Sequence, residues 1–360
     1  MALSLFGIDK SSLGNVIINS IDDDYLRTLQ SQGADITINE TINGGFELPL
    51  TNGSTKQYTL IKIIDNFLFI DFTIGVINNK DFKVYYTTLN LSSSIADNVA
   101  NLKPLLYGEY KSKLKVLEDY FLSMYHIDLS LEDTYFKEIE INKTLIDTKY
   151  SFEDYNTLFD TLQAYMNPKQ YKVKDKYGLV TSDTNNYFST FEFATSKRKK
   201  TKKSAKRLKI YDKRLELSKR QIGIDTYAIR FEYVLREEQI TKNLGTNKVH
   251  NLNDTILLDF YESNITKDVF ETLDKAIKDQ NKQLVQMYQD VKSNMKRGYL
   301  REFFHRASHI AIDQEQVEAI ALADMKKSGN YKKNKALLES IVPQHNLDKL
   351  EELKELLLLS

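Results

Sequence analysis

A tyrosine between two lysines, in the stretch RLKIYDK at residues 207–213, has the type and spacing needed for nucleophilic chemistry. If the stretch is a β-strand, Lys209, Tyr211 and Lys213 share one face and Leu208 and Ile210 face the core, because successive side chains alternate. Two ammonium groups beside a phenol favour the phenolate, which can attack a phosphodiester and form a covalent phosphotyrosine link. A half-buried tyrosine in an ordinary strand fits the same pattern, since the chain has 22 tyrosines.

The segment that precedes this tyrosine is the most basic part of the chain. Nine of the thirteen residues from 197 to 209 are Lys or Arg, although the whole chain balances 50 basic against 50 acidic residues. A local basic patch in a neutral protein can bind phosphate without attracting nucleic acid to the entire surface. We therefore expect DNA contacts from this run and from one later arginine, namely Lys197, Arg198, Lys199, Lys200, Lys202, Lys203, Lys206, Arg207, Lys209 and Arg230.

Two further segments carry carboxylates at strand spacing. In KEIEINKT, alternation puts Glu138, Glu140 and Asn142 on one face, and in YAIRFEYVLR it puts Glu232 between two arginines. Carboxylate and amide oxygens are the ligands that Mg²⁺ and Mn²⁺ prefer, and arginines bind phosphate oxygens. Glu140, Glu232 and Glu138 are therefore the predicted metal ligands. A polar strand face and a surface ion-pair ladder remain as alternatives.

The elements that must position these residues follow an α+β pattern. The first 90 residues read as sheet, and the chain turns helical from about residue 266. Between these parts, strands are predicted over 134–146, 186–195, 206–213 and 226–236, with helices over 95–124 and 151–166. We expect an antiparallel β-sheet body with flanking helices over 1–262. A helical C-terminal region over 263–360 would serve DNA binding or oligomerisation.

Composition excludes several classes of protein. The chain has no Cys, which rules out disulfides, thiolate zinc sites and a cysteine nucleophile and fits a reducing cytoplasm. No phosphate-binding glycine motif is present, so a nucleotide-driven motor is not expected. The most apolar stretch, 60–77, is interrupted by charged residues and reads as sheet core. Since the first residues also lack a signal-peptide pattern, we expect a cytoplasmic protein that does not enter the membrane.

The order of the segments resembles a known family, the trans-acting replication initiators of small rolling-circle plasmids from Gram-positive bacteria. It resembles the gene II-type nicking proteins of filamentous phages more loosely. The shared order is an acidic strand, a helix, an extended pair ending in Ile-Tyr-Asx-Lys with Glu three residues later, and an Arg-x-Glu strand. Here these are FKEIEINKT, SFEDYNTLFDTL, STFEFATSKRKKTKKSAKRLKIYDKRLEL and YAIRFEYVLR. The resemblance covers about 134–240, and IYDKxxE is its most specific part.

The resemblance implies a role for each matching residue. Tyr211 matches the nucleophile that cuts one DNA strand, Lys213 matches the lysine beside it, and Glu140 and Glu232 match metal-binding carboxylates. The acidic strand departs from the family pattern, which more often reads Arg-hydrophobic-Asp, because Glu138 stands where the arginine would be. The basic insertion before the tyrosine strand is also longer. These departures affect the predicted metal ligands more than the tyrosine.

The resemblance thus predicts a site-specific endonuclease that initiates rolling-circle replication of a plasmid or phage. It would nick and rejoin one origin strand through a phosphotyrosine intermediate, with Mg²⁺ or Mn²⁺ as cofactor. Its partner would be origin DNA, single-stranded or extruded at the nick, with a host helicase and a second copy of the chain as further candidates. A conjugative relaxase, a non-catalytic DNA-binding protein and a phage structural or assembly protein are the alternatives.

Overall fold

The fold is that of a computed structural model of the chain. It describes the following residues: 3–42, 57–66, 68, 70–79, 82–92, 102–166, 171–174, 190–195, 206–219, 221–236, 238–311, 313–327, 329–342 and 346–358.

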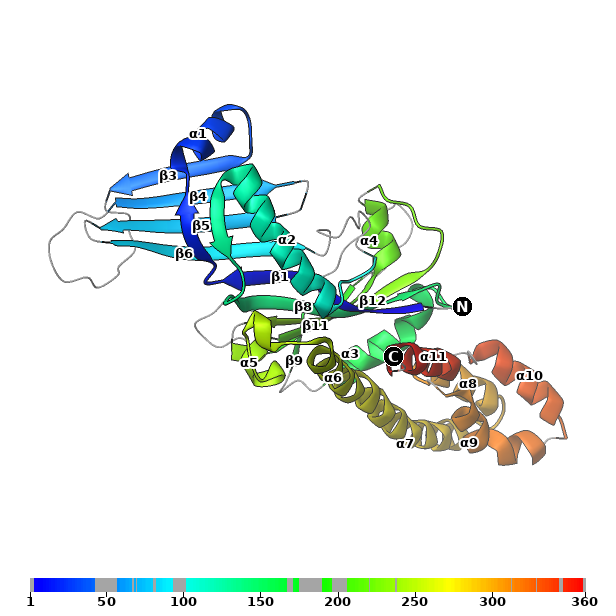
Figure 1. The fold of residues 1–360 in the computed structure, drawn as a ribbon. Coiled ribbons are helices and arrows are strands. Elements are labelled where there is room, and N and C mark those ends of the chain that lie inside the picture. The colour runs from blue at the N-terminus through cyan, green and yellow to red at the C-terminus, as the bar shows by residue number, and fades with distance from the viewer. Residues whose placement is uncertain are drawn as a thin grey trace.

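Ten strands form one antiparallel sheet in the order β3-β4-β5-β6-β1-β8-β12-β11-β10-β9, and β2 pairs with β7 separately. Figure 1 shows the N-terminal strand β1 in the middle of the sheet, where it joins the β3–β6 half to the half that ends in β9. The strands are β1 (Leu3–Gly14), β2 (Ile17–Ile21), β3 (Ile36–Ile42), β4 (Gln57–Asp65), β5 (Ile70–Asn79), β6 (Phe82–Ser92), β7 (Ile127–Ser130), β8 (Tyr135–Ile146), β9 (Tyr171–Lys174), β10 (Thr190–Thr195), β11 (Lys206–Asp212) and β12 (Ala228–Arg236).

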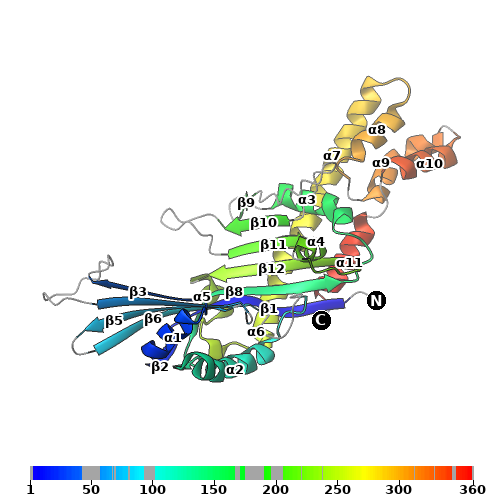
Figure 2. The same cartoon turned by 90° about the horizontal axis from the view of Figure 1, so that it is seen from above.

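The helices cover the sheet and then extend away from it. The first seven are α1 (Asp23–Ser31), α2 (Tyr107–Tyr125), α3 (Asn156–Tyr165), α4 (Lys213–Lys219), α5 (Glu238–Leu244), α6 (Asp254–Ile265) and α7 (Glu271–Asn294). The last four are α8 (Tyr299–Ala307), α9 (Gln314–Lys327), α10 (Tyr331–Ile341) and α11 (Asn346–Leu358). Figure 2 shows α7 to α10 projecting from the sheet, whereas α11 returns to it.

Alternation along the strands decides which sheet face meets the helices. Leu208 and Ile210 of β11, Ile141 of β8 and Phe231 of β12 are all fully buried in the main core, as the spacing of β11 predicted for its two apolar residues. Helices α6 and α11 contact β8 on this side, and the Phe6 ring of β1 meets Tyr261 of α6 edge-on. Figure 1 places α4 on the opposite side of the sheet from α3, α6 and α11.

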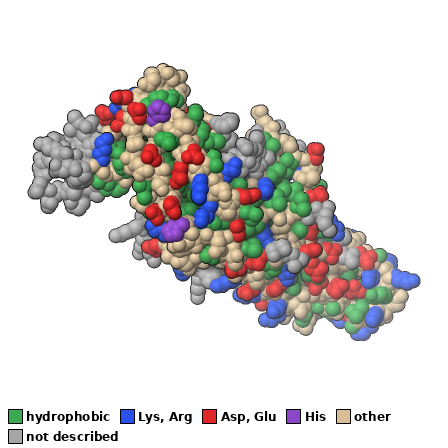
Figure 3. All heavy atoms as spheres, viewed as in Figure 1, with side chains coloured by type: hydrophobic (Ala, Val, Ile, Leu, Met, Phe, Trp, Pro, Cys, Tyr) green, Lys and Arg blue, Asp and Glu red, His purple; other side chains and the backbone are tan. Residues whose placement is uncertain are grey.

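A second apolar core lies in the projecting helices. It contains side chains from α7 to α10 and the residue that follows α10, among them Leu284, Phe303, Val317, Leu338 and Val342. On the face drawn in Figure 3, acidic and basic side chains are interspersed over these helices.

The predicted fold class is confirmed, because the structure is an antiparallel α+β body with a long helical C-terminal region. The predicted boundary between residues 262 and 263 differs from the structure. It falls inside α6, which continues through a π-helical turn, Thr266–Phe270, into α7. Helix α11 also belongs to the first core, since Leu350, Leu353 and Leu357 are buried there. Local helical periodicity cannot reveal which core a helix joins.

Candidate active site

Pairing of strands β8, β12 and β11 gathers the acidic and basic residues of their shared polar face. Glu232 of β12 lies directly opposite Asn142 of β8 on one side and Lys209 of β11 on the other. Glu140 is two residues before Asn142, and Tyr211 is two residues after Lys209, so both point to this same face. The face turned away from the helix-packed core therefore carries a continuous polar row.

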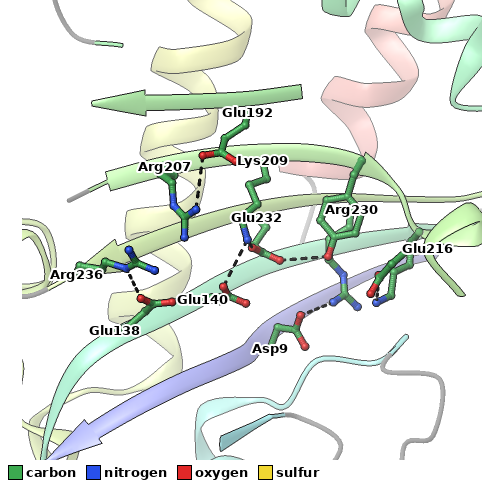
Figure 4. A network of polar contacts seen from close by, with 12 residues as sticks. Asp9, Glu138, Glu140, Glu192, Arg207, Lys209, Glu216, Arg230, Glu232 and Arg236 are labelled. Atoms are coloured by element: carbon green, nitrogen blue, oxygen red, sulfur yellow. Dashed lines mark hydrogen bonds and ion pairs between the residues drawn. The ribbon is translucent and has the colours of Figure 1, made fainter. Parts of the chain in front are cut away.

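A β-bulge in β1 adds a third carboxylate to this row. The register between β1 and β8 shifts between Ile8 and Ser11, which pair with Ile141 and Ile139. Asp9 and Lys10 of β1 therefore lie opposite a single residue of β8, Glu140. Bulges re-aim side chains in this way, and Figure 4 shows the Asp9, Glu140 and Glu232 carboxylates approaching one another from three different strands.

The three carboxylates form a buried cluster that could hold a metal ion. Asp9, Glu140 and Glu232 each offer an oxygen within 4.8 Å of the others, and their exposed fractions are only 3%, 5% and 2%. Oε2 of Glu140 is buried and has no hydrogen-bond partner among the described residues. Hard carboxylate oxygens, one of them unpartnered, suit the ligand preferences of a hard divalent cation.

Lys209 supplies a positive charge inside the cluster. Its Nζ donates to Oε1 of Glu232 and lies 3.5 Å from Oε1 of Glu140. Burial alone would lower the pKa of Lys209, but the two carboxylates outweigh burial and raise the pKa above its ordinary value. Lys209 is therefore a permanent ammonium between two of the three acids.

Burial and like charge together raise the pKa of Glu140 to about 7, with burial the larger cause and Glu232 the next. Lys209 opposes both effects without cancelling them. Glu140 therefore binds a proton more readily than an ordinary glutamate does.

Tyr211 contacts this cluster directly. Its hydroxyl donates to Oε2 of Glu232 at 3.2 Å. Burial, followed by the charge of Glu232, raises the pKa of Tyr211 well above its ordinary value. The sequence predicted the opposite, namely that two flanking lysines would lower the pKa of Tyr211 and favour the phenolate. Lys209 pairs with carboxylates, and Lys213 is not a strand residue but begins α4, where its Nζ lies 2.5 Å from Oε2 of Glu216. Tyr211 is therefore a neutral phenol in this arrangement.

Arg230 holds Asp9 in place. Its guanidinium is fully buried and donates to Oδ2 of Asp9 at 2.7 Å, to Oγ1 of Thr144 at 2.8 Å and to the carbonyl of Leu102 at 3.3 Å. Arg230 was predicted to contact DNA, but its guanidinium is fully buried on the polar face and is bound to Asp9, Thr144 and Leu102. It links β12 to β1 and to the segment before α2.

No protein-family model matches the chain, and no curated protein matches its sequence. The described residues contain no helix of sufficient length and apolarity to span a membrane.

Three other residues predicted for the site pair with residues outside the cluster. Glu138, proposed as a metal ligand, pairs with Arg236 and is not among the three carboxylates whose oxygens converge. In the basic run, Lys206 points to the helix side, where its Nζ lies 3.1 Å from Oδ2 of Asp268. Arg207 stays on the polar face, 3.5 Å from Glu192. Six predicted DNA contacts lie outside the described residues, namely Lys197, Arg198, Lys199, Lys200, Lys202 and Lys203.

Asp9 is the residue of the cluster that sequence reasoning missed. The stretch LSLFGIDKSSLG, residues 3–14, carries apolar residues around a single acid, which is a weak strand signal. Only the pairing of β1 with β8 brings that acid beside Glu140.

Proposed function

We propose that this protein is a metal-dependent tyrosine DNA nickase and strand transferase of the kind that initiates rolling-circle replication. The observation that carries the proposal is the hydrogen bond from Tyr211 to Glu232, which joins a tyrosine to a buried three-carboxylate cluster. A strand-borne phenol beside a group of hard oxygen ligands suits attack on a phosphodiester.

The proposed chemistry is a transesterification. The Tyr211 oxygen attacks the phosphorus, the P–O3′ bond breaks, and a 5′-phosphotyrosine and a free 3′-hydroxyl result. Because the pKa of Tyr211 is raised, its proton must leave as the new bond forms, and Glu232 already accepts its hydrogen bond. The proton finally resides on the 3′ oxygen, so no water is consumed. The reverse attack by the 3′-hydroxyl rejoins the strand.

Asp9, Glu140 and Glu232 would hold Mg²⁺ or Mn²⁺, which when bound would polarise the scissile phosphate. Tyr211 and Lys209 are the partly exposed members of the site, whereas the three acids are buried. A phosphate would therefore approach over β11. We propose that the basic run 197–209 holds the DNA backbone, with little sequence discrimination.

The test is covalent capture of DNA. The protein is incubated with labelled random-sequence single-stranded oligonucleotides in Mg²⁺, in Mn²⁺ or in EDTA, and products that survive denaturing electrophoresis are collected. We expect a metal-dependent protein–DNA adduct, mapped by mass spectrometry to Tyr211 and absent from Tyr211→Phe. Tyr227→Phe is the matched control, because Tyr227 is exposed and immediately precedes β12.

An adduct that persists in Tyr211→Phe would assign the nucleophile elsewhere. Metal-independent DNA binding that is equal in both proteins, with no adduct even after the pool is enriched for bound sequences, would identify a binding protein instead.

A further inference from the structure

We infer that Lys209 is the resident counter-cation of the carboxylate cluster and that a divalent metal binds by displacing its ammonium group. The inference rests on the metal site of the proposed function, but not on nicking or on DNA.

The geometry puts the ammonium on the oxygens that a metal would need. Lys209 lies opposite Glu232 in the sheet and reaches one oxygen of Glu232 and one of Glu140. These are two of the three acids whose oxygens converge within 4.8 Å. A divalent ion bound by the same carboxylates would sit within a few ångströms of the ammonium, and two cations at that separation repel strongly in a buried site.

Lys209 and Arg230 form ion pairs with the cluster, and Lys209 is the one of these two that can leave. Arg230 is fully buried, and its guanidinium is bound by Asp9, Thr144 and a backbone carbonyl. The Lys209 side chain is 21% exposed and sits on a flexible four-carbon stem. If the Lys209 side chain turned toward solvent, it would lose its ion pairs with Glu140 and Glu232. The bound metal would then supply the positive charge that these carboxylates lose.

The displaced ammonium would remain close to Tyr211. Lys209 and Tyr211 are two residues apart on one face of β11, so an ammonium released from the acids stays beside the tyrosine. Metal loading would thereby turn Lys209 from a partner of carboxylates into a cation available to a phosphate at Tyr211. If Lys209 only fills and neutralises the site, its removal would loosen the acids and metal affinity would not rise.

The deciding experiment measures Mn²⁺ affinity in the absence of DNA, by titration calorimetry and by the electron paramagnetic resonance signal of free Mn²⁺. We expect Lys209→Met to bind Mn²⁺ at least ~10-fold more tightly than the wild type, because the repulsion is gone. Arg236→Met is the matched control and should stay within about twofold, because Arg236 pairs with Glu138 outside the cluster. Equal or weaker binding by Lys209→Met would overturn the inference.

A second measurement uses the wild-type chain, so it does not depend on how well the variant folds. Acetylation of lysines, read by mass spectrometry, should be faster at Lys209 after Mn²⁺ is added and unchanged at Lys206, which pairs with Asp268. Unchanged reactivity of Lys209 at saturating Mn²⁺ would contradict displacement.

The two proposals can fail separately. Tighter Mn²⁺ binding by Lys209→Met, without any DNA adduct, would support displacement of Lys209 and contradict the proposed nicking activity. An adduct that forms in EDTA would support Tyr211 as a nucleophile. If no variant also bound Mn²⁺, both the metal site and the displacement of Lys209 would be contradicted.

Discussion

The polar row on β8, β12 and β11 is chemically unusual at the level of single side chains, because three acids share a space from which water is largely excluded. One ammonium and one guanidinium balance them, and the protonation of Glu140 adjusts the remaining charge. Tyr211 has a raised pKa in the same environment, so the site stores a phenol and not a phenolate. In the proposed reaction, deprotonation of Tyr211 must therefore accompany the binding of DNA.

Glu140 should make the stability of the metal-free protein depend on pH. Its pKa rises from 4.5 to about 7 on folding, so the folded state holds a proton that the unfolded state has lost between these values. The free energy of unfolding should therefore fall as pH rises through this window, by roughly 3 kcal/mol for the full shift. Urea unfolding at pH 4.5 and pH 7.5 in EDTA measures it.

Glu140→Gln is the control for this prediction, because an amide cannot titrate. The variant should lose less stability than the wild type over the same window. If both proteins change equally between the two pH values, other groups are responsible.

The N-terminal strand is the element that completes the site. Its bulge delivers Asp9, and its edge also pairs with the segment before α2, where the amide and carbonyl of Ile8 bond to Leu105 at 2.8 and 3.0 Å. Gly7 permits this approach, because a Cβ there would collide with the carbonyl oxygen of Leu105. Gly7 therefore allows β1 to approach the segment that carries the Leu102 carbonyl.

Gly7→Ala should displace the 102–105 segment or β1, and Asp9 with it. We expect a loss of about 1–3 kcal/mol in the free energy of unfolding and a weaker affinity for Mn²⁺, measured by urea unfolding and calorimetry. Gly223→Ala is the matched control, because a Cβ at Gly223 would meet nothing within 4 Å. Wild-type Mn²⁺ affinity in Gly7→Ala would show that the close approach does not support the site.

At the scale of the whole molecule, two cores share one chain. The first combines the sheet with α11, which is fixed by a hydrogen bond of 2.8 Å from the buried Lys143 to the carbonyl of Leu357. Glu352 of α11 accepts further bonds from the amide of Lys149 at 2.8 Å and the hydroxyl of Tyr155 at 2.6 Å. The second core lies within α7 to α10 and the turn after α10, so the chain leaves the body and returns to it.

Substitutions in the two cores should therefore have different consequences for the site. Leu353→Ala and Leu338→Ala each remove a fully buried side chain and should each cost about 2–5 kcal/mol of unfolding free energy, measured in urea. Only Leu353→Ala should also weaken Mn²⁺ binding, because α11 contacts β1 and β8. Equal weakening by both variants would mean that the helical region and the sheet behave as one packing unit.

Period-two alternation was enough to predict from the sequence that Glu140, Glu232 and Tyr211 lie on polar strand faces and that Leu208 and Ile210 lie in the core. Side-chain direction along a strand is a local property, so a single segment reveals it. The helical character of the C-terminal region was predictable for the same reason.

The tertiary structure alone decided how these faces meet. Asp9 joins Glu140 through a pairing between residues more than a hundred positions apart, and no local pattern specifies that register or its bulge. The sequence predicted a phenolate, but burial and the charge of Glu232 raise the pKa of Tyr211. The two lysines that flank Tyr211 in the sequence bond to carboxylates, Lys209 to Glu232 and Lys213 to Glu216. Tertiary structure also decides that α11 packs in the core of the sheet and that Glu138 forms an ion pair with Arg236. Local periodicity sets which way a side chain points, but the charge and solvent around it depend on segments that only folding brings together.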